Sequence, residues 1–244
     1  MCPEPVIPAS SWSFPLPEDV DLVGRAAVVT GAVGDIGRAI AGGLLAAGAG
    51  VVVAGPSART RANVIATAAE GAARVVVCDD SHARSVVDAA VDSFGRLDLI
   101  VNVAGSVLNL SSEPLSPADI EWVYDNDVRE VLPLASAAIS QLSRSPHGAV
   151  VNVIPHCTSA GVERGSIHAA IKLAMLSLTS SMSAQFADVG VRVNAVTVES
   201  SQEEAGAADL VWPVLVLAGG TARHLTGQVL ATGRGLVSAR QRTA

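Results

Sequence analysis

The sequence predicts an α/β fold, a single domain of three layers in which a doubly wound parallel sheet lies between helices. From Arg25 onward, short valine-rich runs alternate with alanine-rich helical stretches, which is typical of a sheet covered by helices on both faces. The 244 residues, half of them hydrophobic, suffice for one core and are short for two. Right-handed crossovers should place any ligand at the carboxyl edge of the strands, where the strand order reverses.

Seven strands are expected along the chain, each a short run rich in β-branched residues. They cover approximately residues 26–30, 51–54, 74–78, 97–101, 149–154, 191–196 and 228–231. Before the first strand, five prolines prevent regular helix and remove hydrogen-bond donors that a sheet needs. We therefore divide the chain into a proline-rich N-terminal arm (1–23), one domain (24–235) and a C-terminal tail (236–244). The arm either lies on the domain or reaches a partner.

Charge and cysteine usage exclude several classes of partner. Sixteen basic against 23 acidic side chains give a net charge of −7 without a long basic run, so nucleic acid and anionic membrane are not expected partners. The three cysteines lack metal-ligand spacing and cannot all pair, which indicates ordinary thiols in a reducing compartment and no metal site. With neither a signal-like start nor an 18-residue uncharged hydrophobic run, the expected location is cytoplasmic.

Two glycine-containing motifs follow predicted strands. Residues 30–37 read Thr-Gly-Ala-Val-Gly-Asp-Ile-Gly between a strand and a helix, where glycines let the backbone approach a pyrophosphate at the helix N-terminus. Residues 102–105 read Asn-Val-Ala-Gly at the end of the fourth strand. Together the motifs resemble the short-chain dehydrogenase/reductase family, and the resemblance extends from about residue 25 to residue 235. It implies a Rossmann-type fold and oxidoreductase chemistry.

The resemblance also implies a set of cofactor contacts. Asp79 resembles the family's adenine-contacting Asp, and Lys172 resembles its ribose-contacting Lys. The full set carried over is Gly31, Gly34, Ile36, Gly37, Asp79, Asn102, Ala104, Gly105 and Lys172. These residues would hold a nicotinamide dinucleotide.

Two departures from the family bear on that cofactor. The middle glycine is displaced to Gly34, which leaves Asp35 in its place, and a carboxylate beside a pyrophosphate costs Coulomb energy unless it points away. After the second strand no acid is available for a ribose 2′-hydroxyl pair, which disfavours NAD. Arg59 or Arg61 could meet a 2′-phosphate, or both could be solvated on a helix. NADP, bound weakly or as a vestige, is the cofactor that the sequence leaves open.

The catalytic tetrad of the family, Asn, Ser, Tyr and Lys, is largely lost. His168 stands where the Tyr is expected, in His168-Ala-Ala-Ile-Lys172, and only Lys172 is kept. The Ser position falls on Pro155, which has no hydroxyl and no backbone donor. Asp127 occupies the Asn position, although a slip of one residue would place Asn126 there. The sequence therefore assigns no catalytic residue outright.

Two interpretations of this pocket stay open. A His beside a Lys has its cationic form disfavoured, so a neutral His168 could act as a base oriented by Asp127, with His156 and Thr158 as added donors. That arrangement would suit a cyclase, dehydratase or isomerase, or an atypical reductase in which His168 replaces Tyr. In the other interpretation the pocket drifted after turnover ceased, with Asp127 and Lys172 neutralising each other.

The segment after the sixth strand points toward lost turnover. In the family a substrate-covering segment of a few dozen residues follows this strand, whereas residues 196–206 here lead almost directly into the next helix. A small substrate would then lie in an open, wet cleft, where electrostatic contributions to catalysis are weaker.

Two helices, 129–142 and 167–186, are apolar around much of their circumference, and a helix apolar beyond one stripe must bury a second face. The apolar residues are Val131, Leu132, Leu134, Ala135, Ala138 and Ile139 on the first helix and Ile171, Leu173, Ala174, Leu176, Leu178 and Met182 on the second. In the family these helices form the dimer contact, so the resemblance implies an oligomer. The alternative is extra packing within the chain. Pro133 is expected to kink the first helix.

Paired assemblies occur in the family, in which one subunit keeps the tetrad and a degenerate sister supports it. This chain resembles the sister, and its combined losses and length are similar to the non-catalytic subunit of the heterotetrameric dehydrogenases of aminocoumarin antibiotic pathways, of the novobiocin type. The resemblance implies a catalytic homologue as partner. It also implies an NADP-dependent complex acting on a β-hydroxy or β-keto acyl thioester, an aminoacyl group on a carrier protein. The chain alone is expected to be inactive.

Overall fold

A computed structural model gives the structure of residues 20–32, 34–55, 75–78, 82–104, 116–154, 162–198 and 207–232. The strands are β1 (Ala26–Thr30), β2 (Gly50–Ala54), β3 (Val75–Cys78), β4 (Leu99–Val103), β5 (Ala149–Ile154), β6 (Arg192–Val198) and β7 (Val229–Thr232). The helices are α1 (Asp35–Ala46), α3 (Ala83–Phe94), α4 (Pro117–Tyr124), α5 (Val131–Leu142), α6 (Val162–Phe186) and α7 (Ala207–Ala218). The expected arm and tail, apart from the arm's last four residues, lie outside the described residues.

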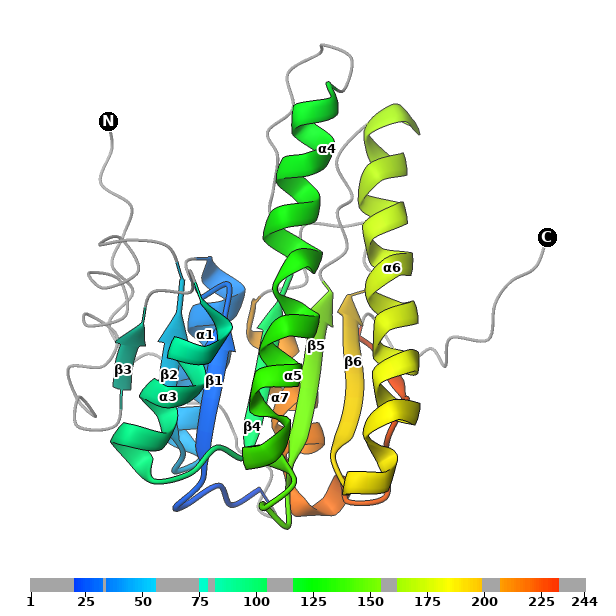
Figure 1. The fold of residues 1–244 in the computed structure, drawn as a ribbon. Coiled ribbons are helices and arrows are strands. Elements are labelled where there is room, and N and C mark those ends of the chain that lie inside the picture. The colour runs from blue at the N-terminus through cyan, green and yellow to red at the C-terminus, as the bar shows by residue number, and fades with distance from the viewer. Residues whose placement is uncertain are drawn as a thin grey trace.

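All seven strands form one parallel sheet in the order β3-β2-β1-β4-β5-β6-β7. The order reverses between β1 and β4, so the carboxyl ends of these two strands flank the expected ligand position (Figure 1). The α/β doubly wound class is therefore confirmed, and the bounds of all seven strands agree with the predicted ones within two residues. The fourth strand was predicted over 97–101 and lies at Leu99–Val103, so Asn102 stands inside the strand and not after it.

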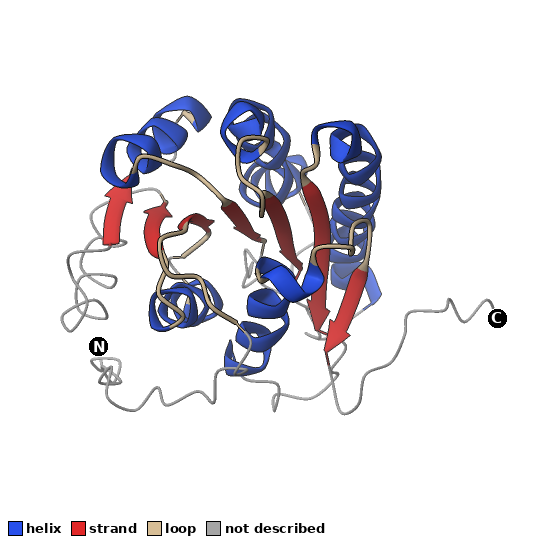
Figure 2. Cartoon of the chain, turned by 90° about the horizontal axis from the view of Figure 1, so that it is seen from below, coloured by secondary structure: helices blue, strands red, loops and turns tan. Residues whose placement is uncertain are grey.

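Helices cover both faces of the sheet, α1 and α7 on one face and α3, α5 and α6 on the other, as the view from the amino edge shows (Figure 2). Successive strand residues alternate between two cores. Val29 and Val101 belong to the core under α1 and α7, whereas Val28 and Ile100 belong to the core under the other three helices. Because strand side chains point alternately to the two faces, a valine-rich strand buried on both sides needs no polar positions.

The helix expected over 129–142 is irregular at its start. A capping box at Ser116 begins α4, and a π-helical turn, Asp125–Arg129, separates it from α5. Pro133 lies in the first turn of α5, where a missing N–H is tolerated, so the irregularity is this turn and not a proline kink within the helix. The second predicted helix, 167–186, begins five residues earlier, at Val162. Both α4 and α6 extend past the carboxyl ends of the strands (Figure 1).

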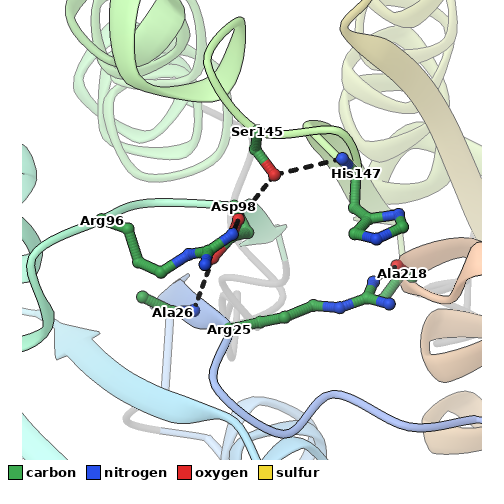
Figure 3. A network of polar contacts seen from close by, with 7 residues as sticks. All are labelled: Arg25, Ala26, Arg96, Asp98, Ser145, His147 and Ala218. Atoms are coloured by element: carbon green, nitrogen blue, oxygen red, sulfur yellow. Dashed lines mark hydrogen bonds and ion pairs between the residues drawn. The ribbon is translucent and has the colours of Figure 1, made fainter.

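At the amino edge of the sheet, one buried carboxylate joins three segments (Figure 3). Asp98, 1% exposed, accepts two hydrogen bonds from the Arg96 guanidinium at 2.6 and 2.7 Å. It also accepts from the Ser145 hydroxyl at 2.5 Å and from the Ala26 backbone N–H at 2.8 Å. The burial of Asp98 would raise its pKa, but these hydrogen bonds hold the pKa below its ordinary value. The pairing fixes β1 against β4 and the loop before β5.

Two arginines at the same edge hold the end of α7. Arg25 donates to the carbonyl of Ala218 at 3.1 Å, and the buried Arg192 donates to the carbonyls of Leu217 and Ala222 at 2.8 and 3.1 Å. The last carbonyls of a helix have no hydrogen-bond donor within it and carry partial negative charge. A guanidinium at this position donates the missing hydrogen bonds and balances the charge. The last turn of α7 has no basic side chain of its own, and distant strands supply the cations.

Candidate functional site

The candidate site begins at the glycine turn between β1 and α1. Gly31 has φ +66°, and a Cβ atom at this position would come within 2.2 Å of the Val103 carbonyl oxygen. A Cβ at Gly37 would come within 2.5 Å of Ala32 Cα. Both contacts are shorter than a side chain tolerates, so glycine is required for the positive φ and for close packing of α1 on the turn.

Gly34, in contrast, faces open space. It is the N-cap of α1, no described side chain caps the helix there, and a Cβ added to Gly34 would meet no described atom within 4 Å. The first N–H groups of a helix, together with its dipole, attract a phosphate group. The turn thus leaves a cradle open where Gly34 stands and is tightly packed at Gly31 and Gly37, as a dinucleotide pyrophosphate requires.

Asp35 does not obstruct that cradle. Its side chain is 80% exposed and forms an ion pair with Arg38, one turn along α1. Because the carboxylate points outward and has a cationic partner, the expected repulsion toward a pyrophosphate is reduced. Ile36, in the same turn, is half-buried and packs against the core under α1.

A chain of buried hydrogen bonds under this turn was not anticipated from the sequence. Asn102 is 2% exposed and accepts a hydrogen bond from the Thr30 hydroxyl at 3.4 Å. Its amide donates to the side-chain oxygen of Asn152 at 2.9 Å, and the Asn152 amide donates to the Thr179 hydroxyl on α6 at 2.8 Å. Asn102 therefore uses its side chain within the protein and supports the turn from below. Ala104, just after β4, is buried beside it.

Two of the residues carried over from the family's tetrad, Asp127 and Lys172, have described side chains. Asp127 is 7% exposed because the π-helical turn directs it inward while its neighbours Asp125 and Arg129 form an exposed ion pair. That turn packs against α6. Lys172 is half-buried and has no hydrogen bond or ion pair with any residue that the structure describes. The suggested neutralisation of Asp127 by Lys172 is therefore not a direct ion pair.

Several predicted site residues lie outside the described part of the chain. His168 lies on the helix α6, but its side chain is not among those described. The same holds for the side chain of Asn126. The residues with neither backbone nor side chain described are Arg59, Arg61, Asp79, Gly105, Pro155, His156 and Thr158. The proposed roles of these residues stay predictions.

Two further observations concern metal and membrane. Within the described ranges, no three His, Cys, Asp or Glu side chains come close enough together to hold a metal ion. None of the helices in those ranges combines the length and the apolar character that crossing a membrane requires.

Comparison with known proteins decides the family. The sequence pattern of the short chain dehydrogenase family matches residues 25–202. The chain belongs to this family. It is 31% identical over 240 residues to an uncharacterised oxidoreductase of Methylorubrum extorquens, an alignment that covers 86% of the chain and 96% of the relative. It is also 34% identical over 181 residues to the 4-formylbenzenesulfonate dehydrogenase of Comamonas testosteroni, covering 70% of the chain and 71% of that enzyme.

Solved structures of the family agree with the fold. A protein of Sinorhizobium meliloti classed with the short-chain alcohol dehydrogenases superposes with a TM-score of 0.75 at 25% identity, over 87% of this chain and 96% of its own. A hydroxysteroid dehydrogenase of Escherichia coli superposes with a TM-score of 0.76 at 22% identity, over 91% of this chain and all of its own. Short-chain dehydrogenases bind nicotinamide dinucleotides, and the glycine turn of this chain fits such a group.

Proposed function

We propose that this short-chain dehydrogenase homologue is a non-catalytic supporting subunit of a hetero-oligomeric, NADP-dependent dehydrogenase. The catalytic subunit would be a homologue that keeps the Ser and the Tyr-x-x-x-Lys of the family. A bound nicotinamide dinucleotide would supply hydride chemistry. In the family, hydroxyls of the Tyr and the Ser handle the proton and hold the substrate oxygen, and neither His168 nor Pro155 carries a hydroxyl. The chain has kept the fold and the glycine turn without the hydroxyls.

The observation that carries the proposal is the outward face of α5 and α6. Several apolar side chains of these two helices pack inside the chain, since Val131, Leu134 and Met182 are buried. Leu132 and Leu173, however, stay 42% and 66% exposed on this face. Both leucines lie on helices that the family resemblance assigns to subunit contacts, and protruding apolar side chains there support a contact with another protein.

The charge pattern of the same face supports a protein contact. Val131–Leu142 contains no charged residue, and neither does the stretch of α6 after Lys172. The exposed positions around Leu173 are small or hydroxyl-bearing: Ala170, Ser177, Ser180, Ser181 and Ala184. Small side chains let two helices approach closely, and solvated helix faces normally carry Lys, Glu, Arg or Asp. We assign the surface formed by α5 and α6 to the catalytic partner.

The substrate assignment rests on the family resemblance alone. The combined loss of the Tyr and the Ser is similar to that of the supporting subunits of aminocoumarin-type complexes. We extend the proposal accordingly to a β-hydroxy or β-keto aminoacyl thioester on a carrier protein, in antibiotic biosynthesis. The active site would be the partner's, and this chain would contribute assembly.

Coexpression with an intact homologue tests the proposal. We expect no NADP-linked turnover from the isolated chain, a stable complex on sizing, and activity of the mixture. Leu173→Asp should reduce pairing at least about tenfold, because a buried unpaired carboxylate at an interface costs more than about 1.4 kcal/mol. Val189→Asp is the matched control, since Val189 is 46% exposed on the 3₁₀ turn after α6, away from this face. Redox turnover by the isolated chain at an ordinary enzymatic rate would contradict the proposal.

The burial of Asp127 favours a second candidate function. A carboxylate held inward beside α6, the helix that carries His168, is the arrangement that a proton-shuffling cyclase, dehydratase or isomerase would need. An atypical reductase with His168 as proton donor would use the same residues. Under either reading, His168→Ala abolishes an activity of the isolated chain. Under the subunit proposal, His168→Ala leaves both pairing and the activity of the complex unchanged.

A further inference from the structure

A row of buried polar side chains crosses the sheet directly below its carboxyl edge. Thr30 of β1 pairs in register with Asn102 of β4, and Asn102 pairs in register with Asn152 of β5. Register partners on neighbouring strands point to the same face of the sheet, so the three side chains form one line perpendicular to the strands. Thr179 of α6 completes the line from the helix layer.

Three members of the row, Asn102, Asn152 and Thr179, each make two hydrogen bonds. Asn102 accepts from Thr30 and donates to Asn152, and Asn152 accepts from Asn102 and donates to Thr179. The Thr179 hydroxyl in turn donates to the carbonyl of Met175, one turn earlier in α6, at 2.8 Å. Asn152, Thr179 and Asn102 are 0, 1 and 2% exposed. The row is continuous from the first strand to the interior of α6.

Burial makes the row stiff. A displaced amide in this position finds no solvent, and a buried polar group left without its partner costs about 1–3 kcal/mol. A shift of α6 relative to β5, or of β4 relative to β5, breaks one of these bonds and leaves two such groups. Movement at one end of the row is therefore either resisted or passed to the other end.

Both ends of the row meet features of the proposed function. Thr30 immediately precedes Gly31, at the start of the turn that fits a pyrophosphate. At the other end, Thr179 lies two turns from Lys172 on the same helix, and the opposite side of that helix exposes Leu173 toward the proposed partner surface. Within the described ranges, this row is the set of side-chain hydrogen bonds that connects the glycine turn to α6.

We propose that the Thr30–Asn102–Asn152–Thr179 row couples nucleotide binding at the glycine turn to the position and rigidity of α6, so that nucleotide binding and subunit pairing strengthen each other. The proposal rests on the nucleotide binding and pairing put forward above. In this scheme the nucleotide has a structural role in a chain without the tetrad, because its binding orders α6, the helix that the catalytic partner contacts. Thr30, Asn102, Asn152 and Thr179 act in this scheme as positioning residues, through their side-chain hydrogen bonds to one another.

Hydrogen exchange of α6 amides in the isolated chain, with and without NADP, tests the coupling without relying on a partner or on turnover. In the unaltered chain we expect saturating NADP to slow exchange in residues 171–183 by about fivefold or more, the lower end of usual coupling strengths. Asn152→Leu interrupts the row, so that NADP still binds but no longer slows exchange in α6.

Asn194→Leu is the matched control. Asn194 is also a fully buried Asn of this sheet, one strand further on, and it uses both ends of its amide, donating to the Leu225 carbonyl and accepting from the Gln228 N–H. It belongs to the amino half of β6, outside the row. The control should lose stability as Asn152→Leu does and keep the effect of NADP on α6. Should Asn152→Leu fail to fold, Thr30→Val removes only the outermost bond of the row and should weaken the same effect.

Each outcome bears on one proposal. If bound NADP does not change the rate of hydrogen exchange in α6 of the unaltered chain, the subunit-pairing proposal is unaffected, and the coupling is overturned. An equal NADP effect in Asn152→Leu and in the unaltered chain also overturns it, and so does a chain that binds no NADP. If the chain binds NADP and orders α6 but never pairs with an intact homologue, the subunit proposal fails while the coupling stands. In a pairing complex, the reciprocal result is a pairing affinity about fivefold or more higher with NADP.

Discussion

The two edges of the sheet differ in what their polar groups do. At the amino edge, Asp98 accepts four hydrogen bonds, and Arg25 and Arg192 donate to the last carbonyls of α7. At the carboxyl edge, Gly34 leaves open space above α1, and Lys172 makes no bond to a described residue. The amino edge is therefore built to hold the chain together, and the carboxyl edge leaves groups available to something else.

This difference shows how residues at the carboxyl edge can change while the fold is kept. In the sequence, Pro155 directly follows β5, and His168 lies on α6, which extends past the carboxyl ends of the strands. Residues that anchor strands and helix ends are concentrated at the opposite edge, in a network that no substrate needs. The groups that stabilise the fold are thus separate from those of the candidate site.

The largest effect is expected at the amino edge. Asp98→Ala should lower the free energy of unfolding by about 3 kcal/mol, because the Ala26 N–H and the Ser145 hydroxyl lose a buried acceptor and Arg96 loses its partner. Denaturant unfolding measures this. Asp88→Ala, which removes an exposed pair with Arg84 at 3.8 Å, is the control and should change stability by less than about 1 kcal/mol. Equal losses of unfolding free energy in Asp98→Ala and Asp88→Ala would contradict the stabilising role given to the amino edge.

A second comparison lies within the glycine turn. Gly37→Ala should destabilise the protein by about 1–3 kcal/mol, since the new methyl group meets Ala32 Cα at 2.5 Å. Gly34→Ala meets no described atom and has an ordinary φ of −86°, so stability should be unchanged. The affinity for NADP should nevertheless fall, because the methyl group occupies the open cradle. Thermal unfolding with and without NADP distinguishes the two, and an unaltered affinity in Gly34→Ala would argue against the cradle.

The smallest effect concerns pH at the amino edge. His147 faces Arg25, Asp98, Arg192 and Arg96, and its pKa is lowered first by burial and then by the positive charge of Arg25. A histidine whose folded pKa is depressed binds its proton more readily in the unfolded state. Stability should therefore decline as the pH falls below the ordinary histidine value of 6.5.

Replacement of this histidine removes that contribution. His147→Gln should flatten the profile of melting temperature against pH between about pH 7 and 5, relative to the unaltered chain. The exposed His224→Gln serves as the control. If His147→Gln leaves the slope of melting temperature against pH unchanged, the protonation of His147 does not contribute to the pH dependence of stability.

The misplaced fourth strand shows where sequence reasoning reached its limit. The sequence predicts the fourth strand over residues 97–101 and places Asn102 at its end. In the structure Asp98 is used for side-chain bonds and Asn102 continues the ladder, paired with Thr30 and Asn152. The partners of Asn102 lie 72 and 50 residues away, so no local pattern could reveal them.

The sequence by itself determined the fold class and the glycine turn, because valine-rich runs and glycine spacing are local properties of the chain. The replacement of the family's tetrad stays a prediction from residue identity. Tertiary structure alone decided which polar groups pair across the sheet, that Asp35 turns outward to Arg38, and that Leu173 stays exposed while Met182 is buried. Burial and hydrogen-bond pairing depend on which residues other elements bring next to each side chain, and those residues are distant in the sequence.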